Sequence, residues 1–120
     1  MKTDVCIVGD GIVGRTLSLL LAQTGLEVTL VQATTPTSTS TTPDVRAYAL
    51  SAASQGILES VRAWPSNPQD IGPISAMRIF DGQHLPVRFD AKAMQTSALA
   101  FMVAAPTLLD SLAQAIRFNP

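Results

Sequence analysis

The sequence predicts an α/β fold, in which a parallel sheet begun by a βαβ unit is followed by a small antiparallel β layer. Two sequence patterns support this prediction, and the length and composition of the chain limit the number of domains. The first 32 residues read in order as strand, glycine loop, helix and strand. Further β-rich runs, separated by turn residues, follow within residues 46–104. The chain has 120 residues, 47% of them apolar, so residues 1–120 suit a single domain or part of one.

The βαβ unit is predicted over residues 3–32. Residues 4–8 form an apolar run rich in β-branched side chains, which is typical of a strand buried on both faces of a parallel sheet. From Ile12 the pattern becomes helical, and Gly25 is a suitable end for this helix. Residues 28–31 form the second β-rich run. The apolar stripe of the helix consists of Val13, Leu17, Leu20, Leu21 and Thr24.

A low-complexity loop is predicted over residues 33–43, which are rich in Thr and Ser and contain two prolines. A surface connection of variable length explains this composition, and a glycosylated or phosphorylated stalk is the alternative. The following segment, 46–104, is expected to hold a helix and then β-rich structure. The spacing of apolar residues predicts the helix over 51–61, and Pro65 and Pro68 close it.

The β-rich segment and a last helix complete the predicted fold. Three runs resemble strands: 74–80, 85–89 and 99–104. Asp81 and Gly82 mark a turn between the first two runs, which indicates antiparallel pairing. A C-terminal helix is predicted over 106–117, because Pro106 suits the first position of a helix. Its apolar face consists of Leu108, Leu109, Leu112, Ala113 and Ile116.

Charge, the length of apolar stretches and the start of the sequence argue against several partners and locations. Eight basic and nine acidic residues give a net charge of −1 without a basic stripe, so no nucleic acid is expected as a partner. The longest apolar stretch, residues 17–22, is far shorter than the ~20 residues of a transmembrane helix. No export signal is recognisable at the start of the sequence. We therefore expect a cytoplasmic protein without a transmembrane segment, and peripheral membrane attachment stays open.

Neither a metal site nor a histidine-based catalytic site is predicted. His84 and Cys6 are the only histidine and the only cysteine in the sequence, so ligands at metal-binding spacing are missing. A histidine beside a turn is most often a solvated surface residue. Cys6 lies within an apolar run, which predicts a buried, unreactive thiol and a reducing compartment.

A glycine-rich motif of the form G-x-G-x-x-G follows the first predicted strand: Gly9-Asp10-Gly11-Ile12-Val13-Gly14. A strand before it, a helix after it and a second strand are typical of a Rossmann-like fold that binds FAD or NAD(P). Gly9 permits the tight turn, Gly11 lets a pyrophosphate approach the backbone, and Gly14 allows the helix to pack closely on the strand. A glycine loop that merely turns the chain is the alternative.

Two positions around the motif are unusual. The second strand of this fold usually ends in an acidic residue that binds ribose hydroxyls, and Gln32 occupies that place, 18 residues after Gly14. Gln32 can form a hydrogen bond with a ribose but brings no charge. Asp10 places a carboxylate between two glycines, where it would repel phosphate. We therefore predict that the Asp10 side chain points away from the ligand.

Several segments beyond the motif carry a family resemblance: Asp44-Val45-Arg46, Ala49-Leu50-Ser51, Ser54, Leu58, Trp64, Pro73-Ile74, Leu99-Ala100-Phe101-Met102-Val103, Leu108 and Leu112. In these residues the chain resembles the FAD-dependent aromatic hydroxylases of the p-hydroxybenzoate hydroxylase type. Within that family it is most similar to the ubiquinone-biosynthesis hydroxylases. The resemblance runs along the full chain.

The resemblance implies FAD as the cofactor, with Arg46 at its pyrophosphate or adenosine ribose; a local ion pair with Asp44 is the alternative. It also implies a monooxygenase that hydroxylates an aromatic small molecule, a polyprenyl phenol in ubiquinone biosynthesis, with NAD(P)H as a candidate reductant. Enzymes of this family are much longer than 120 residues. We therefore expect an incomplete domain that holds no catalytic residue and is not catalytically competent alone.

Two other functions stay open. A non-catalytic, truncated nucleotide-binding fragment, or one half of a split flavoprotein, would expose apolar surface and so associate with itself or with a missing C-terminal half. An NAD(P)-dependent dehydrogenase shares the βαβ unit but would continue with alternating strands and helices. The β-rich segment after residue 46 disfavours the dehydrogenase.

Overall fold

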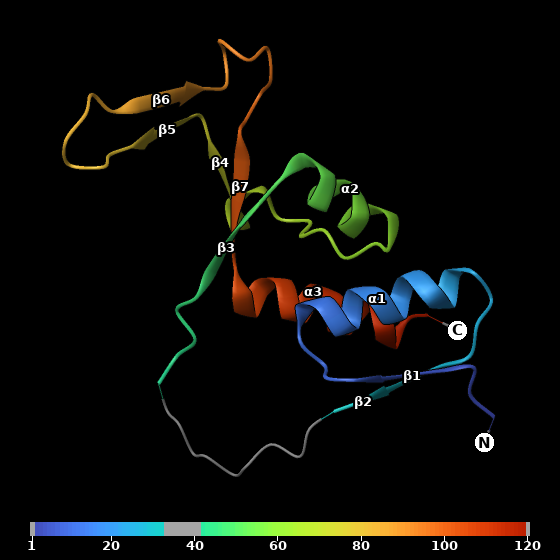
Figure 1. Cartoon of the computed structure of the whole chain (residues 1–120). Helices are drawn as coiled ribbons and strands as arrows, with labels where there is room; N and C mark the ends of the chain where they lie inside the picture. Colours follow the sequence, from blue (N-terminus) through green and yellow to red (C-terminus); the bar gives the residue numbers. More distant parts are fainter. Residues whose placement is uncertain (1, 33–41, 120) are drawn as a thin grey trace.

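The structure is a computed structural model that describes residues 2–32 and 42–119, so most of the predicted low-complexity loop lies outside the described residues. Figure 1 shows how the helices and strands are arranged. In chain order they are β1 (Val5–Val8), α1 (Ile12–Gln23), β2 (Val28–Val31), β3 (Ala47–Leu50), α2 (Ala52–Ser60), η1 (Pro68–Asp70), β4 (Ile71–Ile74), β5 (Ala76–Ile79), β6 (Val87–Asp90), β7 (Ala100–Ala104) and α3 (Ala105–Arg117).

The βαβ unit consists of β1, α1 and β2. The two strands pair in parallel, from Val5 opposite Val28 to Val8 opposite Val31. Helix α1 connects them, and it is followed by Gly25, whose φ of +86° suits a glycine after a helix end. Together with the antiparallel sheets that follow, this parallel pair confirms the predicted fold class.

The antiparallel part differs in detail from the prediction. Strand β7 lies between β3 and β4 in one sheet, and β3 was not predicted because three of its four residues are not typical of strands. The predicted strand over 74–80 is divided at Ser75, where the chain leaves this sheet. The Ile74 carbonyl still accepts the N–H of Leu99 (2.8 Å), whereas the Ser75 carbonyl accepts that of Ala91 (2.8 Å). Strands β4 and β5 therefore belong to different sheets.

Strands β5 and β6 form an antiparallel hairpin that projects from the rest of the chain (Figure 1). Its loop contains the predicted turn. The Asp81 carboxylate accepts the backbone N–H groups of Gln83 (2.9 Å) and His84 (2.8 Å), and Gly82 has a φ of +82°. The His84 side chain is exposed, as predicted.

The main core lies between the three labelled α-helices and the sheet of β3, β7 and β4. Helix α3 lies beside α1 (Figure 1). Helix α2 begins at a Ser51 cap, whose hydroxyl accepts the N–H of Ser54 (3.2 Å). The buried core cluster consists of Leu19, Leu58, Val61, Ala63, Val103, Leu108 and Leu112.

The buried face of α1 is not the predicted stripe. Leu19 and Ser18 are 4% and 8% exposed, whereas Val13 and Leu17 are 80% and 43% exposed. The reason is that α1 packs against α3 as well as β2, so its buried face is turned toward α3. A pattern within one helix cannot reveal this second neighbour.

One face of the parallel sheet is not covered by any described residue. Ile7 faces α1, but Cys6 and Val8 are exposed, Val8 by 82% of its surface. The predictions of a strand buried on both faces and of a buried thiol were therefore wrong. The physical reason is that α1 covers only one face of this short sheet.

The described chain is elongated. Its Cα radius of gyration is 17.7 Å and its principal extents are 59 × 36 × 28 Å. A compact domain of this length would have a radius of gyration of about 14 Å. The β5–β6 hairpin and the β1–β2 sheet lie at opposite ends of the long direction (Figure 1).

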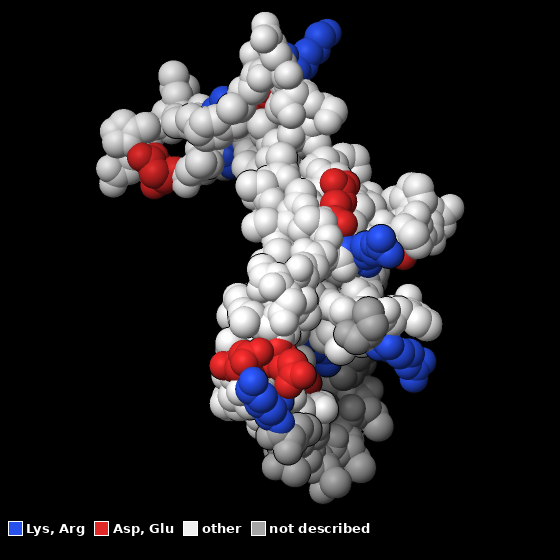
Figure 2. All heavy atoms as spheres, turned by 90° about the vertical axis from the view of Figure 1, so that its right-hand side faces the viewer, with Lys and Arg blue, Asp and Glu red and all other residues white. Residues whose placement is uncertain are grey.

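Charged side chains of both signs occur in small mixed groups on the face shown in Figure 2. Among the residues that the structure describes, no helix is both long enough and apolar enough to cross a membrane. Within the same residues, no group of three or more His, Cys, Asp or Glu side chains could hold a metal ion.

Candidate nucleotide-binding site

The glycine loop, residues 9–14, joins the end of β1 to α1. The N–H of Gly9 donates to the Val31 carbonyl (2.9 Å), which holds the start of the loop at the end of β2. Gly9 has a φ of +115°, which favours glycine. A Cβ on Gly14 would collide with the Gly9 carbonyl oxygen and lie 3.6 Å from Cγ2 of Ile7. Both positions therefore require glycine for the helix to start close against the strand.

The N-terminus of α1 is open. Gly11 is its N-cap, and no described side chain caps this end of the helix. The Gly11 carbonyl accepts the N–H of Arg15 (3.0 Å), so the N–H groups of Ile12 and Val13 precede the first helical hydrogen bond. A Cβ on Gly11 would meet no described atom within 4 Å. Free N–H groups, the positive end of the helix dipole and open space at the backbone together suit a phosphate group.

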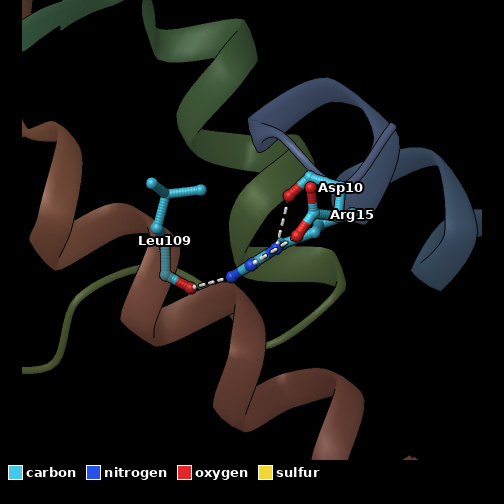
Figure 3. Close-up of polar contacts among 3 residues, drawn as sticks. All are labelled: Asp10, Arg15 and Leu109. Atoms are coloured by element: carbon cyan, nitrogen blue, oxygen red, sulfur yellow. Dashed lines mark hydrogen bonds and ion pairs between the residues drawn. The ribbon is translucent and has the colours of Figure 1, made fainter. Parts of the chain in front are cut away.

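Arg15 ties the glycine loop to α3 (Figure 3). Its Nε donates to the Asp10 carbonyl (2.6 Å), Nη2 to the Asp10 carboxylate (3.3 Å) and Nη1 to the Leu109 carbonyl (2.9 Å). The side chains of Arg15 and Asp10 are 20% and 27% exposed. Sequence analysis missed Arg15, although a basic residue five positions after the acidic residue of a glycine loop is a signal for such a pair.

Gln32 lies beside the glycine loop, because it directly follows Val31, whose carbonyl holds Gly9. It borders a pocket of about 210 Å³ together with Asp10 and Arg15. The remaining lining residues are Leu30, Ala113 and Ile116. The structure thus brings the predicted ribose-binding residue next to the predicted phosphate-binding loop.

A larger pocket, of about 410 Å³, lies at the other end of α1 and α3. Its lining residues are Leu19, Gln23, Val61, Arg62, Gln114, Ala115, Phe118 and Asn119. None of them belongs to the glycine loop. Helix C-termini carry the negative end of the dipole, which disfavours phosphate. The size of a pocket therefore does not identify the nucleotide site here.

Arg46 forms the local ion pair that the sequence left as an alternative. Its Nε and Nη2 donate to the two carboxylate oxygens of Asp44 at 2.9 Å and 2.8 Å. These side-chain hydrogen bonds, with one from the Arg46 backbone N–H, lower the pKa of Asp44 from 3.8 to about 2. The same pair raises the pKa of Arg46 above its ordinary value. The Arg46 side chain is 65% exposed, so its contact with a cofactor stays a prediction.

The N-terminal part of α3 connects these positions. The N–H of Ala105 donates to the Arg46 carbonyl (2.8 Å), and the Leu109 carbonyl, four residues further on, accepts from Arg15. Arg46 therefore lies at the end of α3 that is next to the glycine loop. Figure 1 shows the N-termini of α1 and α3 on the same side of the molecule, where β1 and β2 also end.

A parallel βαβ unit with this open glycine loop defines a dinucleotide-binding domain. A family model described as "FAD binding domain" matches residues 2–115. The chain therefore belongs to this family of FAD-binding domains, and FAD is its cofactor. The predicted family and cofactor are both confirmed.

Named relatives include two ubiquinone-related hydroxylases. The chain is 33% identical over 121 residues to the 3-demethoxyubiquinol 3-hydroxylase of Escherichia coli (strain K12), covering 98% of this chain and 31% of that protein. It is 31% identical over 101 residues to ubiquinone hydroxylase UbiL of Rhodospirillum rubrum, covering 83% of this chain and 24% of that protein.

The fold is similar to a solved structure, that of p-nitrophenol 4-monooxygenase PnpA from Pseudomonas putida DLL-E4. The TM-score is 0.61 with 19% sequence identity, covering 97% of this chain and 29% of that one. At this identity the likeness concerns the fold alone. The chain thus spans between 24% and 31% of the length of these three proteins.

Proposed function

We propose that the chain forms the part of an FAD site that binds the adenosine diphosphate half of the cofactor, in a monooxygenase that hydroxylates an aromatic ring. The observation that carries this proposal is the open N-terminus of α1 behind the glycine loop, where Gly11 adjoins free space. Membership of the FAD-binding family supports FAD over other dinucleotides.

In this proposal the N–H groups of Gly11, Ile12 and Val13 donate to the pyrophosphate, and Gln32 forms a hydrogen bond with a ribose hydroxyl. Arg46 reaches the pyrophosphate or adenosine ribose after leaving Asp44. An exposed ion pair of this kind holds its partners only weakly, so the exchange costs little. FAD supplies the redox chemistry when it is bound. We assign no catalytic role to residues 2–32 and 42–119, which bind and orient the cofactor.

The names of the two hydroxylase relatives support a quinone-related aromatic substrate. We propose a polyprenyl phenol in ubiquinone biosynthesis as the substrate of the whole enzyme, with NAD(P)H as the reductant. A polyprenyl chain is strongly apolar and partitions into a bilayer. This chemistry favours peripheral attachment of the whole enzyme to a membrane.

Calorimetric titration of the chain with FAD, ADP and NADH tests the proposal. We expect micromolar binding of FAD, measurable binding of ADP and no competition from NADH. Gly11→Ala should weaken FAD and ADP binding by about tenfold or more, because its methyl group occupies the space that the phosphate needs. The unfolding temperature of the Gly11→Ala variant should stay unchanged, since the new Cβ meets no described atom within 4 Å.

Gly56→Ala is the matched control, because Gly56 lies in α2 and its added Cβ also meets no described atom within 4 Å. FAD affinity should be the same in this variant and in the unchanged chain. Equal FAD affinity in Gly11→Ala would contradict the proposed phosphate site. Binding of ADP without FAD would indicate a fragment that needs a partner to complete the flavin site.

A non-catalytic, self-associating nucleotide-binding fragment is the second candidate. The exposed apolar residues of β1 and of the β5–β6 hairpin favour it, among them Val8, Ile79, Phe80 and Leu85. Both candidates predict binding of the ADP half, and they differ in the behaviour of the chain at high concentration.

A further inference from the structure

Arg15 is placed where the glycine loop, α1 and α3 meet (Figure 3). Its guanidinium donates to a carbonyl and a carboxylate of the loop and to a carbonyl of α3. The Arg15 side chain is 20% exposed, compared with 65% for Arg46, so water screens its contacts less. These contacts give Arg15 a role that the glycine motif alone does not require.

We propose that Arg15 is a positioning residue for the bound dinucleotide: it fixes the peptide between Asp10 and Gly11, and it neutralises the Asp10 carboxylate beside the phosphates. This inference rests on the proposed function, because it takes the glycine loop as the phosphate site.

The first part follows from peptide geometry. The described chain has no cis peptide bond, and in a trans peptide the C=O and the N–H of the next residue point in opposite directions. Arg15 holds the Asp10 carbonyl on the side of α3. The Gly11 N–H therefore points to the side opposite α3, and the position that a Cβ of Gly11 would take is also open. Arg15 thus orients the N–H group of Gly11, a hydrogen-bond donor to the phosphate, before the ligand binds.

The second part concerns charge. An uncompensated carboxylate within the loop would repel a pyrophosphate. Nη2 of Arg15 lies 3.3 Å from the Asp10 carboxylate and offsets its charge. This ion pair explains how the loop can contain an acidic residue and still accept an anion.

Helix α3 extends the role of Arg15 beyond the loop. Arg15 is bound to the Leu109 carbonyl, and the N–H of Ala105 in the same helix holds the Arg46 carbonyl. One helix therefore sets the positions of the glycine loop and of the Arg46 backbone relative to each other. Both segments are proposed to contact the same cofactor.

A ligand-free experiment tests the fixed peptide. In NMR spectra of the chain without nucleotide, Arg15→Gln should shift and broaden the amide signal of Gly11. The amide of Leu58, buried in α2, should not change. An unchanged Gly11 signal would overturn the inference whether or not the chain binds FAD.

FAD titration at low and high salt tests the role of the charge. Arg15→Gln should weaken FAD binding by about tenfold or more at low salt. High salt should recover part of this loss, because it screens the Asp10 carboxylate, which the variant leaves without its ion-pair partner, from the phosphates. Adding Asp10→Asn to Arg15→Gln should recover the same part at low salt.

Arg88→Gln is the matched control. It also removes one positive charge and one ion pair, with Asp90 at 2.9 Å, but on the β5–β6 hairpin. FAD affinity should not change in this variant. If the loss in Arg15→Gln is insensitive to salt and to Asp10→Asn, the charge-neutralising part of the inference is overturned. If the unchanged chain binds no FAD although the Gly11 signal responds to Arg15→Gln, the proposed function fails while the peptide-fixing role of Arg15 is supported.

Discussion

Charged residues at the candidate site are paired with close neighbours in the sequence. Asp10 pairs with Arg15 across the start of α1, and Asp44 pairs with Arg46 before β3. The two pairs differ in their surroundings: the first is mostly buried and bound to α3, whereas the second is largely exposed. We therefore assign a positioning role to Arg15 and expect Arg46 to exchange partners.

The pKa of Asp44 provides a test of the second pair. Hydrogen bonds from Arg46 hold this pKa at about 2, so Arg46→Gln should return it toward 3.8. The pKa of Asp44 is lower in the folded chain than in the unfolded chain. The pair therefore stabilises the fold fully at pH values above the unfolded pKa of 3.8, and this contribution is lost as the pH falls through the folded pKa of about 2. An NMR titration that follows the side-chain carboxyl signal of each aspartate measures the change.

Asp81 is an internal control for this titration. Its pKa is also lowered to about 2, chiefly by the backbone N–H of His84, followed by the His84 side chain and the N–H of Gln83. It should therefore not respond to Arg46→Gln. If the pKa of Asp44 is the same in Arg46→Gln and in the unchanged chain, the ion pair of Asp44 and Arg46 does not form in solution.

At the scale of elements, the start of α1 depends on close contact between helix and strand. Gly14 meets the Gly9 carbonyl so closely that no side chain fits between them. Helix α2 has no such contact at Gly56. Replacing glycine by alanine should therefore have opposite effects on stability at Gly14 in α1 and at Gly56 in α2.

Gly14→Ala should lower the free energy of unfolding by about 1–3 kcal/mol, because the loop and helix must move apart. Gly56→Ala should raise it by about 0.5–1 kcal/mol, because alanine restricts the unfolded chain and favours a helix interior. Urea unfolding monitored by circular dichroism compares the two variants with the unchanged chain. A Gly14→Ala chain as stable as the unchanged one would mean that the close contact is absent.

At the scale of the whole molecule, elongation leaves apolar surface at both ends. Cys6 and Val8 lie on the uncovered face of β1, and the hairpin exposes 67% of Phe80 and 91% of Leu85. Apolar surface of this kind favours association, because burying it removes it from water. The chain spans less than a third of the length of its named relatives.

We expect the chain to self-associate as its concentration rises, which sedimentation velocity measures directly. The double variant Phe80→Ser and Leu85→Ser should associate less, because it removes apolar surface from the hairpin. Gln83→Ser in the same loop is the control and should not change association. A chain that stays a monodisperse monomer at high concentration would argue against the self-associating fragment as its function.

Local sequence patterns determined the elements whose causes lie close together in the chain. The glycine motif, the run of residues 28–31 and the positions of Ser51 and Pro106 were sufficient to predict the βαβ unit and the later helices. Turn residues at 81 and 82 likewise predicted the hairpin loop. In each case backbone conformation or a hydrogen bond within a few residues decides the structure.

Tertiary structure alone decided the features that depend on distant partners. Strand β3 exists because β7 pairs with it, and the buried face of α1 is set by α3. Arg15 reaches Leu109, which is 94 positions away in the sequence, so no local pattern could show that it ties the glycine loop to α3. The exposure of Cys6 has the same origin, because burial depends on which element covers a face and not on how apolar the strand is.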